Sequence, residues 1–131
     1  MIILIQLTGV TLLLLAAIHI GFPRYFKWSK ELARISLINA EMLRIHTLFV
    51  ATTVGLMGWL CVTSAEELVM TPFGKTVSLG LAIFWTLRLG VQFFGYSAIL
   101  WRGKPFETTL HIGFIALWTW LSGLFWSLAI T

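Results

Sequence analysis

The sequence predicts an all-α polytopic membrane protein whose four transmembrane helices form an up-down-up-down bundle. Of its 131 residues, 59% are apolar and only 11% are charged, too few polar groups to cover a soluble domain of this size. The charged residues gather in short clusters between long uncharged stretches, as expected of a chain surrounded by lipid. Four such stretches have at least ~18 lipid-compatible residues, enough to cross a hydrocarbon core of ~30 Å.

The predicted spans lie within a single domain, residues 1–131, and cover residues 2–22, 36–63, 72–100 and 105–130. The first span lacks a basic start, which favours a retained helix over a cleaved signal peptide, and Pro23 and Arg24 end it. Thr71 and Pro72 suit the cap and first turn of the third span. The connections are short, which favours antiparallel neighbours and hence the bundle.

Small residues mark the surfaces where helices are expected to approach closely. Ala17 and Gly21 in the first span are four residues apart, and so are Ala51 and Gly55 in the second, with Gly58 soon after. In lipid, such spacing favours close backbone contact between helices.

Basic residues predict the orientation. Lys75 lies on one side of the predicted membrane, whereas seven basic residues lie on the other: Arg24, Lys27, Lys30, Arg34, Arg44, Arg102 and Lys104. By the positive-inside rule this places both termini outside the cytoplasm, and we expect a bacterial inner membrane. The formal net charge of +4 is then explained by topology and lipid headgroups, so nucleic acid is not an expected partner.

Three histidines are candidate ligands because the alternating spans carry them to the same membrane side. His19, His46 and His111 lie within ~5 Å of the predicted span ends on that side. They are either interfacial side chains bonded to water, headgroups or backbone, or ligands through a ring nitrogen. The second interpretation predicts haem b, a chlorin or a metal ion as cofactor, with His19 and His111 as axial ligands.

Arg88 lies near the predicted bilayer midplane, where a charged residue costs ~3 kcal/mol or more. Gln92 and Tyr96 follow it at four-residue spacing, so the three form a polar stripe towards the histidine side. Trp85, three residues before Arg88, is a candidate cation–π partner. Arg88 either reaches carbonyls and the interface, or binds an anionic or oxygen-bearing group from outside the chain: a haem propionate, a quinone, a lipid, or a carboxylate on another subunit.

Three segments carry a resemblance: residues 37–42 leading to His46, residues 87–94, and the histidine that opens the fourth span. Together they resemble a group of small, uncharacterised four-span bacterial membrane proteins, over most of the chain. That resemblance implies no known activity. The layout is also similar to four-helix haem-binding membrane proteins such as the HemJ and copper-resistance D types, from which no functional residue is carried over.

The sequence does not favour an enzyme, since it has no Ser/His/Asp or Cys/His pattern, no paired acidic residues in a span and no phosphate-binding glycine loop. Two hypotheses follow. The first is an accessory subunit of a larger membrane complex, respiratory or photosynthetic, that packs against other integral membrane subunits and helps to hold haem, chlorin, quinone or lipid. The second is a self-contained haem or metal protein built on the three histidines.

Overall fold

The computed structural model describes residues 1–95 and 103–131, and every regular element in these ranges is helical. The elements are α1 (Ile2–Tyr25), α2 (Trp28–Glu31), the 3₁₀ helix η1 (Leu32–Arg34), α3 (Leu37–Thr63), α4 (Ala65–Met70), α5 (Pro72–Phe94) and α6 (Pro105–Ile130). Four of them, α1, α3, α5 and α6, are long and apolar enough to cross a membrane. The predicted class, an all-α membrane protein with four spans, is confirmed.

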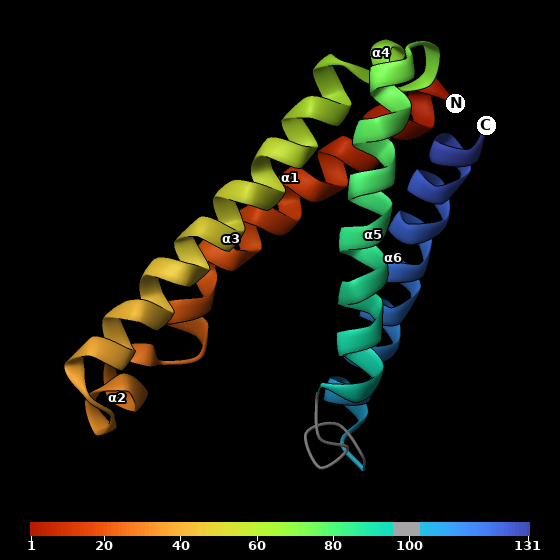
Figure 1. Ribbon diagram of the computed structural model, residues 1–131. Coiled ribbons are helices and arrows are strands. Elements are labelled where there is room, and N and C mark those ends of the chain that lie inside the picture. Colours follow the sequence, from red (N-terminus) through yellow and green to blue (C-terminus); the bar gives the residue numbers. More distant parts are fainter. Residues whose placement is uncertain (96–102) are drawn as a thin grey trace. The chain divides into compact units, whose positions relative to one another are not determined.

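The chain divides into two compact units, residues 1–65 and 66–131. In the first unit α1 and α3 lie side by side along their length, and in the second unit α5 and α6 do so (Figure 1). Each unit is therefore a helical hairpin. The joining of the two hairpins in one bundle, and with it the single domain, stays a prediction.

The first span is longer than predicted, because α1 continues through Pro23 to Tyr25. Proline lacks an N–H and removes one helical hydrogen bond, but so near the helix end little further structure depends on that bond. The helix ends at Tyr25, and Lys27, two residues later, has a left-handed conformation with φ 54°. The prediction that Pro23 stops the span was wrong.

Side-chain caps begin two of the long helices. The Ser36 hydroxyl accepts a hydrogen bond from the Asn39 N–H (3.4 Å) at the start of α3. The Thr71 hydroxyl accepts one from the Gly74 N–H (2.9 Å), with Pro72 in the first turn of α5, as predicted. The predicted end of that span, residue 100, lies outside the described residues.

Glycines bring α1 and α3 into close contact. A Cβ atom added to Gly9 would lie 2.7 Å from the Gly58 carbonyl oxygen, and one added to Gly58 would lie 2.7 Å from that of Gly9. Ala51 and Gly58 are buried, as expected for a contact surface on α3. The pair expected on α1, Ala17 and Gly21, lies outside the contact with α3, since both residues are exposed and a Cβ on Gly21 would meet nothing within 4 Å. Its contact with another helix stays a prediction.

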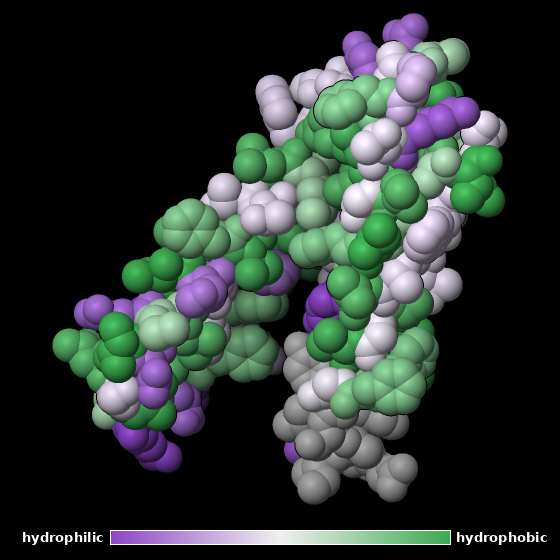
Figure 2. All heavy atoms as spheres, in the orientation of Figure 1, coloured by the Kyte–Doolittle hydropathy of each residue, from purple (hydrophilic) through white to green (hydrophobic). Residues whose placement is uncertain are grey.

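Threonine side chains inside the spans bond to their own helices. Thr11, Thr52 and Thr119, among others, donate to the carbonyl oxygen four residues earlier, over 2.7–3.0 Å. Apolar side chains cover much of the long helices, and hydrophilic ones gather near their ends (Figure 2). The hydroxyls are thereby satisfied without water, as a lipid environment requires.

Candidate functional site

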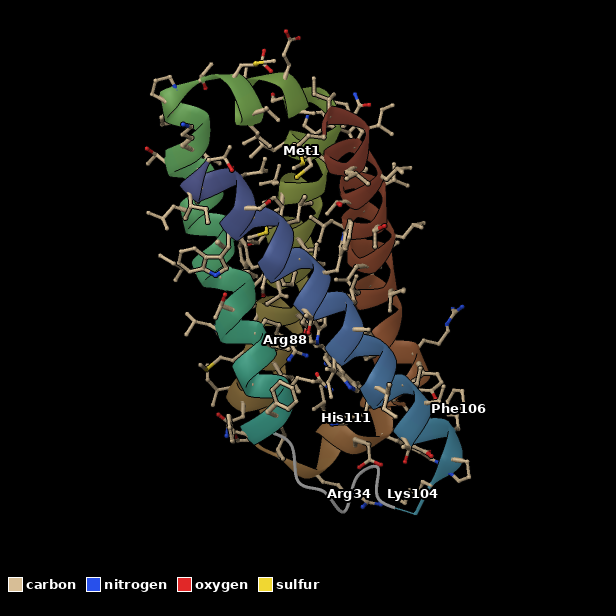
Figure 3. The ribbon with its side chains drawn as sticks, turned by 90° about the vertical axis from the view of Figure 1, so that its right-hand side faces the viewer. Met1, Arg34, Arg88, Lys104, Phe106 and His111 are labelled. Carbon is tan, nitrogen blue, oxygen red and sulfur yellow. The ribbon has the colours of Figure 1, made fainter. Side chains whose placement is uncertain are left out.

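The strongest cluster of polar side chains within a span lies in the α5–α6 hairpin and joins three of the predicted residues. Arg88, which is half-buried, donates from Nη1 to Oε1 of Gln92 (3.3 Å) one turn further along α5. Gln92 is 5% exposed, and its Nε2 lies 2.8 Å from Nδ1 of His111 on α6. Figure 3 shows Arg88 and His111 in this hairpin.

The orientation of the Gln92 amide follows from its neighbours. Its Oε1 accepts from Arg88 Nη1 and also from Trp118 Nε1 (3.2 Å). Guanidinium and indole N–H groups donate and never accept, so the amide oxygen must face them. The amide NH₂ therefore faces His111 and donates to Nδ1.

This orientation fixes the His111 tautomer. Because Nδ1 accepts the hydrogen bond from Gln92, the neutral imidazole carries its hydrogen on Nε2. Ligation of a metal through Nε2 would move that hydrogen to Nδ1, where it would meet the Gln92 NH₂ group. In this arrangement His111 is suited to donate a hydrogen bond from Nε2, and the predicted axial ligation would require Gln92 to turn.

Aromatic rings form the apolar side of the cluster. The Trp118 ring stacks almost parallel to those of Trp85 (centroids 5.3 Å apart, 12°) and Phe114 (5.5 Å, 9°). The Arg88 guanidinium carbon lies 4.8 Å from the Trp118 centroid, a cation–π contact. Arg88 thus contacts Trp118, on the facing helix. The expected partner, Trp85, is stacked against Trp118 in the core.

Heptad spacing explains why these residues meet. On α5, Ser78, Trp85 and Gln92 are seven residues apart, close to two helical turns, and all are buried. On α6 the corresponding residues are His111, Trp118 and Phe125. When these two rows of side chains face each other, Gln92 lies next to both His111 and Trp118.

His19 and His46 belong to the first unit and have a different hydrogen-bond pattern. Nδ1 of His19 donates to the Leu15 carbonyl (2.9 Å), and Nδ1 of His46 to that of Met42 (2.7 Å). Carbonyl oxygens only accept, so Nδ1 carries the hydrogen in both rings and, when neutral, each has its lone pair on Nε2. Within each unit, the described residues form no group of three His, Cys, Asp or Glu side chains placed to hold a metal ion.

The structure thus brings together only some of the predicted site residues. Arg88, Gln92 and His111 form one network, while Tyr96 lies outside the described residues. His19 and His46 belong to the other unit, so the convergence of three imidazoles stays a prediction. The sequence analysis missed the hydrogen bond from Trp118 to Gln92. Trp118 follows His111 by seven residues, so the spacing already places both on one face of α6.

Comparison with known proteins found no matching family model, curated protein or solved structure.

Proposed function

We propose that this chain is a small accessory subunit of a larger membrane complex of the electron-transfer class, respiratory or photosynthetic. The observation that carries the proposal is the Arg88–Gln92–His111 network within a membrane-spanning hairpin. A charged residue in a span costs ~3 kcal/mol or more, and such residues mark ligand or partner sites. The partners of Arg88 on this hairpin include an amide oxygen and an indole ring, neither of which is charged.

The network is suited to a group that accepts hydrogen bonds. Guanidinium N–H groups and a histidine Nε2–H are donors, and donors of this kind bind quinone carbonyls or the carboxylates of haem and chlorin side chains. A carboxylate on a neighbouring subunit has the same chemistry. We therefore propose that the α5–α6 hairpin holds an oxygen-bearing cofactor or partner at the edge of the complex.

The proposed setting is the bacterial inner membrane, with both termini outside the cytoplasm. The support for this orientation is the distribution of Lys and Arg among the connections.

Native gel migration of the full-length protein, extracted from its own membranes in mild detergent, tests the proposal. The wild-type chain should migrate with a large complex, and Arg88→Gln should release it while its amount in the membrane stays unchanged. Thr86→Val is the matched control, because Thr86 lies on another face of α5 and accepts only from Trp126 among the hydrogen bonds described (2.8 Å). A wild-type chain that migrates alone and carries no quinone, haem or chlorin by mass spectrometry would contradict the proposal.

A self-contained haem protein is the second candidate, and the tautomers of His19 and His46 favour it. Each ring directs its Nδ1–H to a carbonyl, the arrangement that commonly orients a histidine ligand that binds through Nε2. This candidate predicts a Soret band in the purified protein that His19→Ala abolishes. Colourless protein that migrates with a complex would exclude it and support the subunit.

A further inference from the structure

Two adjoining cavities lie at one end of the α1–α3 hairpin, beside α2. The larger, of about 530 Å³, is lined by Pro23, Arg24, Lys27, Trp28, Ser29, Lys30 and Arg44. The smaller, of about 120 Å³, is lined by His19, Ile20, Pro23, Arg44, Thr47, Leu48 and Ala51. Pro23 and Arg44 line both, so the two cavities are neighbours.

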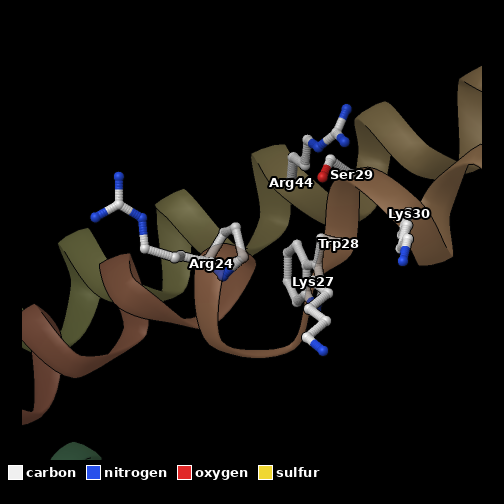
Figure 4. Close-up of a pocket in the computed structure, with 7 residues that line it drawn as sticks. Arg24, Lys27, Trp28, Ser29, Lys30 and Arg44 are labelled. Carbon is white, nitrogen blue, oxygen red and sulfur yellow. The ribbon is translucent and has the colours of Figure 1, made fainter.

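The larger cavity has the chemistry of an anion site. Four of its seven lining residues are cationic, one is a serine, and none is acidic. In Figure 4 the guanidinium groups of Arg24 and Arg44 rise from separate places on the same side of the ribbon, Lys27 and Lys30 point to the other side, and the Ser29 hydroxyl lies beside Arg44. Arginine forks match phosphate oxygens in geometry, and the two lysines add positive charge without a fixed direction.

The fold builds this cavity through the α1–α2 turn. Because α1 continues past Pro23, Arg24 is held on a helix, and the left-handed backbone at Lys27 then turns the chain into α2. A left-handed residue other than glycine costs ~1 kcal/mol, and such strain concentrates at functional sites. The turn brings Trp28 and Ser29 to Arg44, two turns inside α3.

The smaller cavity adds an apolar part. It lies between α1 and α3, where Ile20, Leu48 and Ala51 supply aliphatic side chains next to the cationic part. A ligand that fills both cavities must have an anionic head and an apolar tail.

We propose that these cavities bind one anionic glycerophospholipid, with its phosphate among the cationic residues of the larger cavity and the start of an acyl chain between α1 and α3. The positive-inside rule accounts for cations anywhere in this connection. It does not account for the position of four of them around one cavity that Trp28 also lines, next to a cavity with aliphatic side chains. This site belongs to the first unit, shares no residue with the Arg88 network and does not depend on the subunit proposal.

The experiment is native mass spectrometry of the full-length protein in detergent after titration with defined lipids. The lipids are phosphatidylglycerol, cardiolipin with its two phosphates, and zwitterionic phosphatidylcholine. Wild-type protein should retain one anionic lipid and bind phosphatidylcholine at least tenfold more weakly, and raised salt should weaken the anionic lipid. Arg24→Gln with Arg44→Gln should lower anionic lipid affinity about tenfold or more.

The matched control is Arg34→Gln with Lys104→Gln. This pair removes the same charge from the same predicted membrane side, but neither residue lines the cavity. Equal loss of lipid in both double variants would overturn the proposal, since only general charge would then matter. Circular dichroism and elution volume confirm that each variant is folded.

Two soluble competitors separate a lipid from a free phosphate compound. Inorganic phosphate and glycerol 3-phosphate carry the head chemistry without the acyl chain. At millimolar concentration neither should displace the bound phosphatidylglycerol. Displacement by either compound at a concentration comparable with the lipid's would overturn the assignment to a lipid.

Discussion

At the scale of single residues, the α5–α6 network depends most on Gln92. Its oxygen serves two donors that cannot accept, and its NH₂ group serves the one imidazole nitrogen that accepts. An amide carries its acceptor and its donor on two separate atoms, so glutamine can serve both sides of the network at once. Its burial makes any change of its hydrogen bonding costly.

The histidine tautomers are therefore expected to differ. His111 should carry its hydrogen on Nε2, whereas His19 and His46 should carry it on Nδ1. Gln92→Glu supplies an ionised carboxylate that accepts but does not donate, so His111 should then gain a hydrogen on Nδ1 while the other two rings stay unchanged. Nitrogen-15 NMR of the labelled rings measures this directly. One common tautomer for all three wild-type rings would contradict the geometry.

Replacement of Gln92 by leucine tests its contribution to stability. The indole N–H of Trp118 would lose its buried acceptor, so we expect a loss of about 2–3 kcal/mol in the free energy of unfolding. Detergent unfolding followed by circular dichroism gives this quantity. Thr86→Val, which removes an acceptor on the exposed side of the same helix, should cost less than half as much.

At the scale of the helices, each hairpin is held by side chains that recur every three or four residues along the contact. The buried residues of α1 illustrate this, since Ile5, Leu12 and Ala16 lie on one face with Gly9. The hairpins differ in what fills the contact. Glycine and alanine lie at the contact between α1 and α3, whereas stacked aromatic rings lie between α5 and α6.

Alanine at Gly9 should loosen the first hairpin. Its Cβ would lie within 3 Å of the Gly58 carbonyl and of Val62 and Cys61 side chains, so the helices must move apart, at a cost of about 1–3 kcal/mol. Gly21→Ala is the matched control, because its Cβ meets nothing within 4 Å and alanine is the better helix former. Equal stability of the two variants in detergent unfolding would count against the close contact.

The sequence predicts the helices better than their contacts. The hydropathy pattern predicted four spans. The Thr71 cap could also be predicted, because a cap depends only on residues close in sequence. The face that α1 presents to α3 could not be predicted from the small-residue spacing, since Gly9 has no small residue four positions away, whereas Ala17 and Gly21 have that spacing but lie outside the contact. Likewise Arg88 and Gln92 were found by spacing, but Trp118 depends on the register between two helices.

At the scale of the whole molecule, four spans and short connections define which segments share a membrane side. The connection that contains α2 and η1 is predicted to face the cytoplasm, and the one that contains α4 the opposite side. Cys61 is buried in α3, so the native thiol is shielded. Single cysteines added elsewhere can therefore report the orientation.

Cysteines at two exposed positions should react from opposite sides. In spheroplasts, a membrane-impermeant maleimide should label Glu66→Cys in α4, whereas Ala33→Cys in η1 should react only after lysis. The wild-type chain, with Cys61 alone, is the control and should stay unlabelled. Labelling of the Ala33→Cys chain before lysis would reverse the proposed topology.

The self-bonded threonines have a consequence for how the chain enters the bilayer. With each hydroxyl folded onto a backbone oxygen, the surface offered to acyl chains is mostly the γ-methyl, so Thr52 or Thr119 partitions more like valine than a hydropathy scale assigns. The translocation machinery should accept these segments as readily as valine-substituted copies.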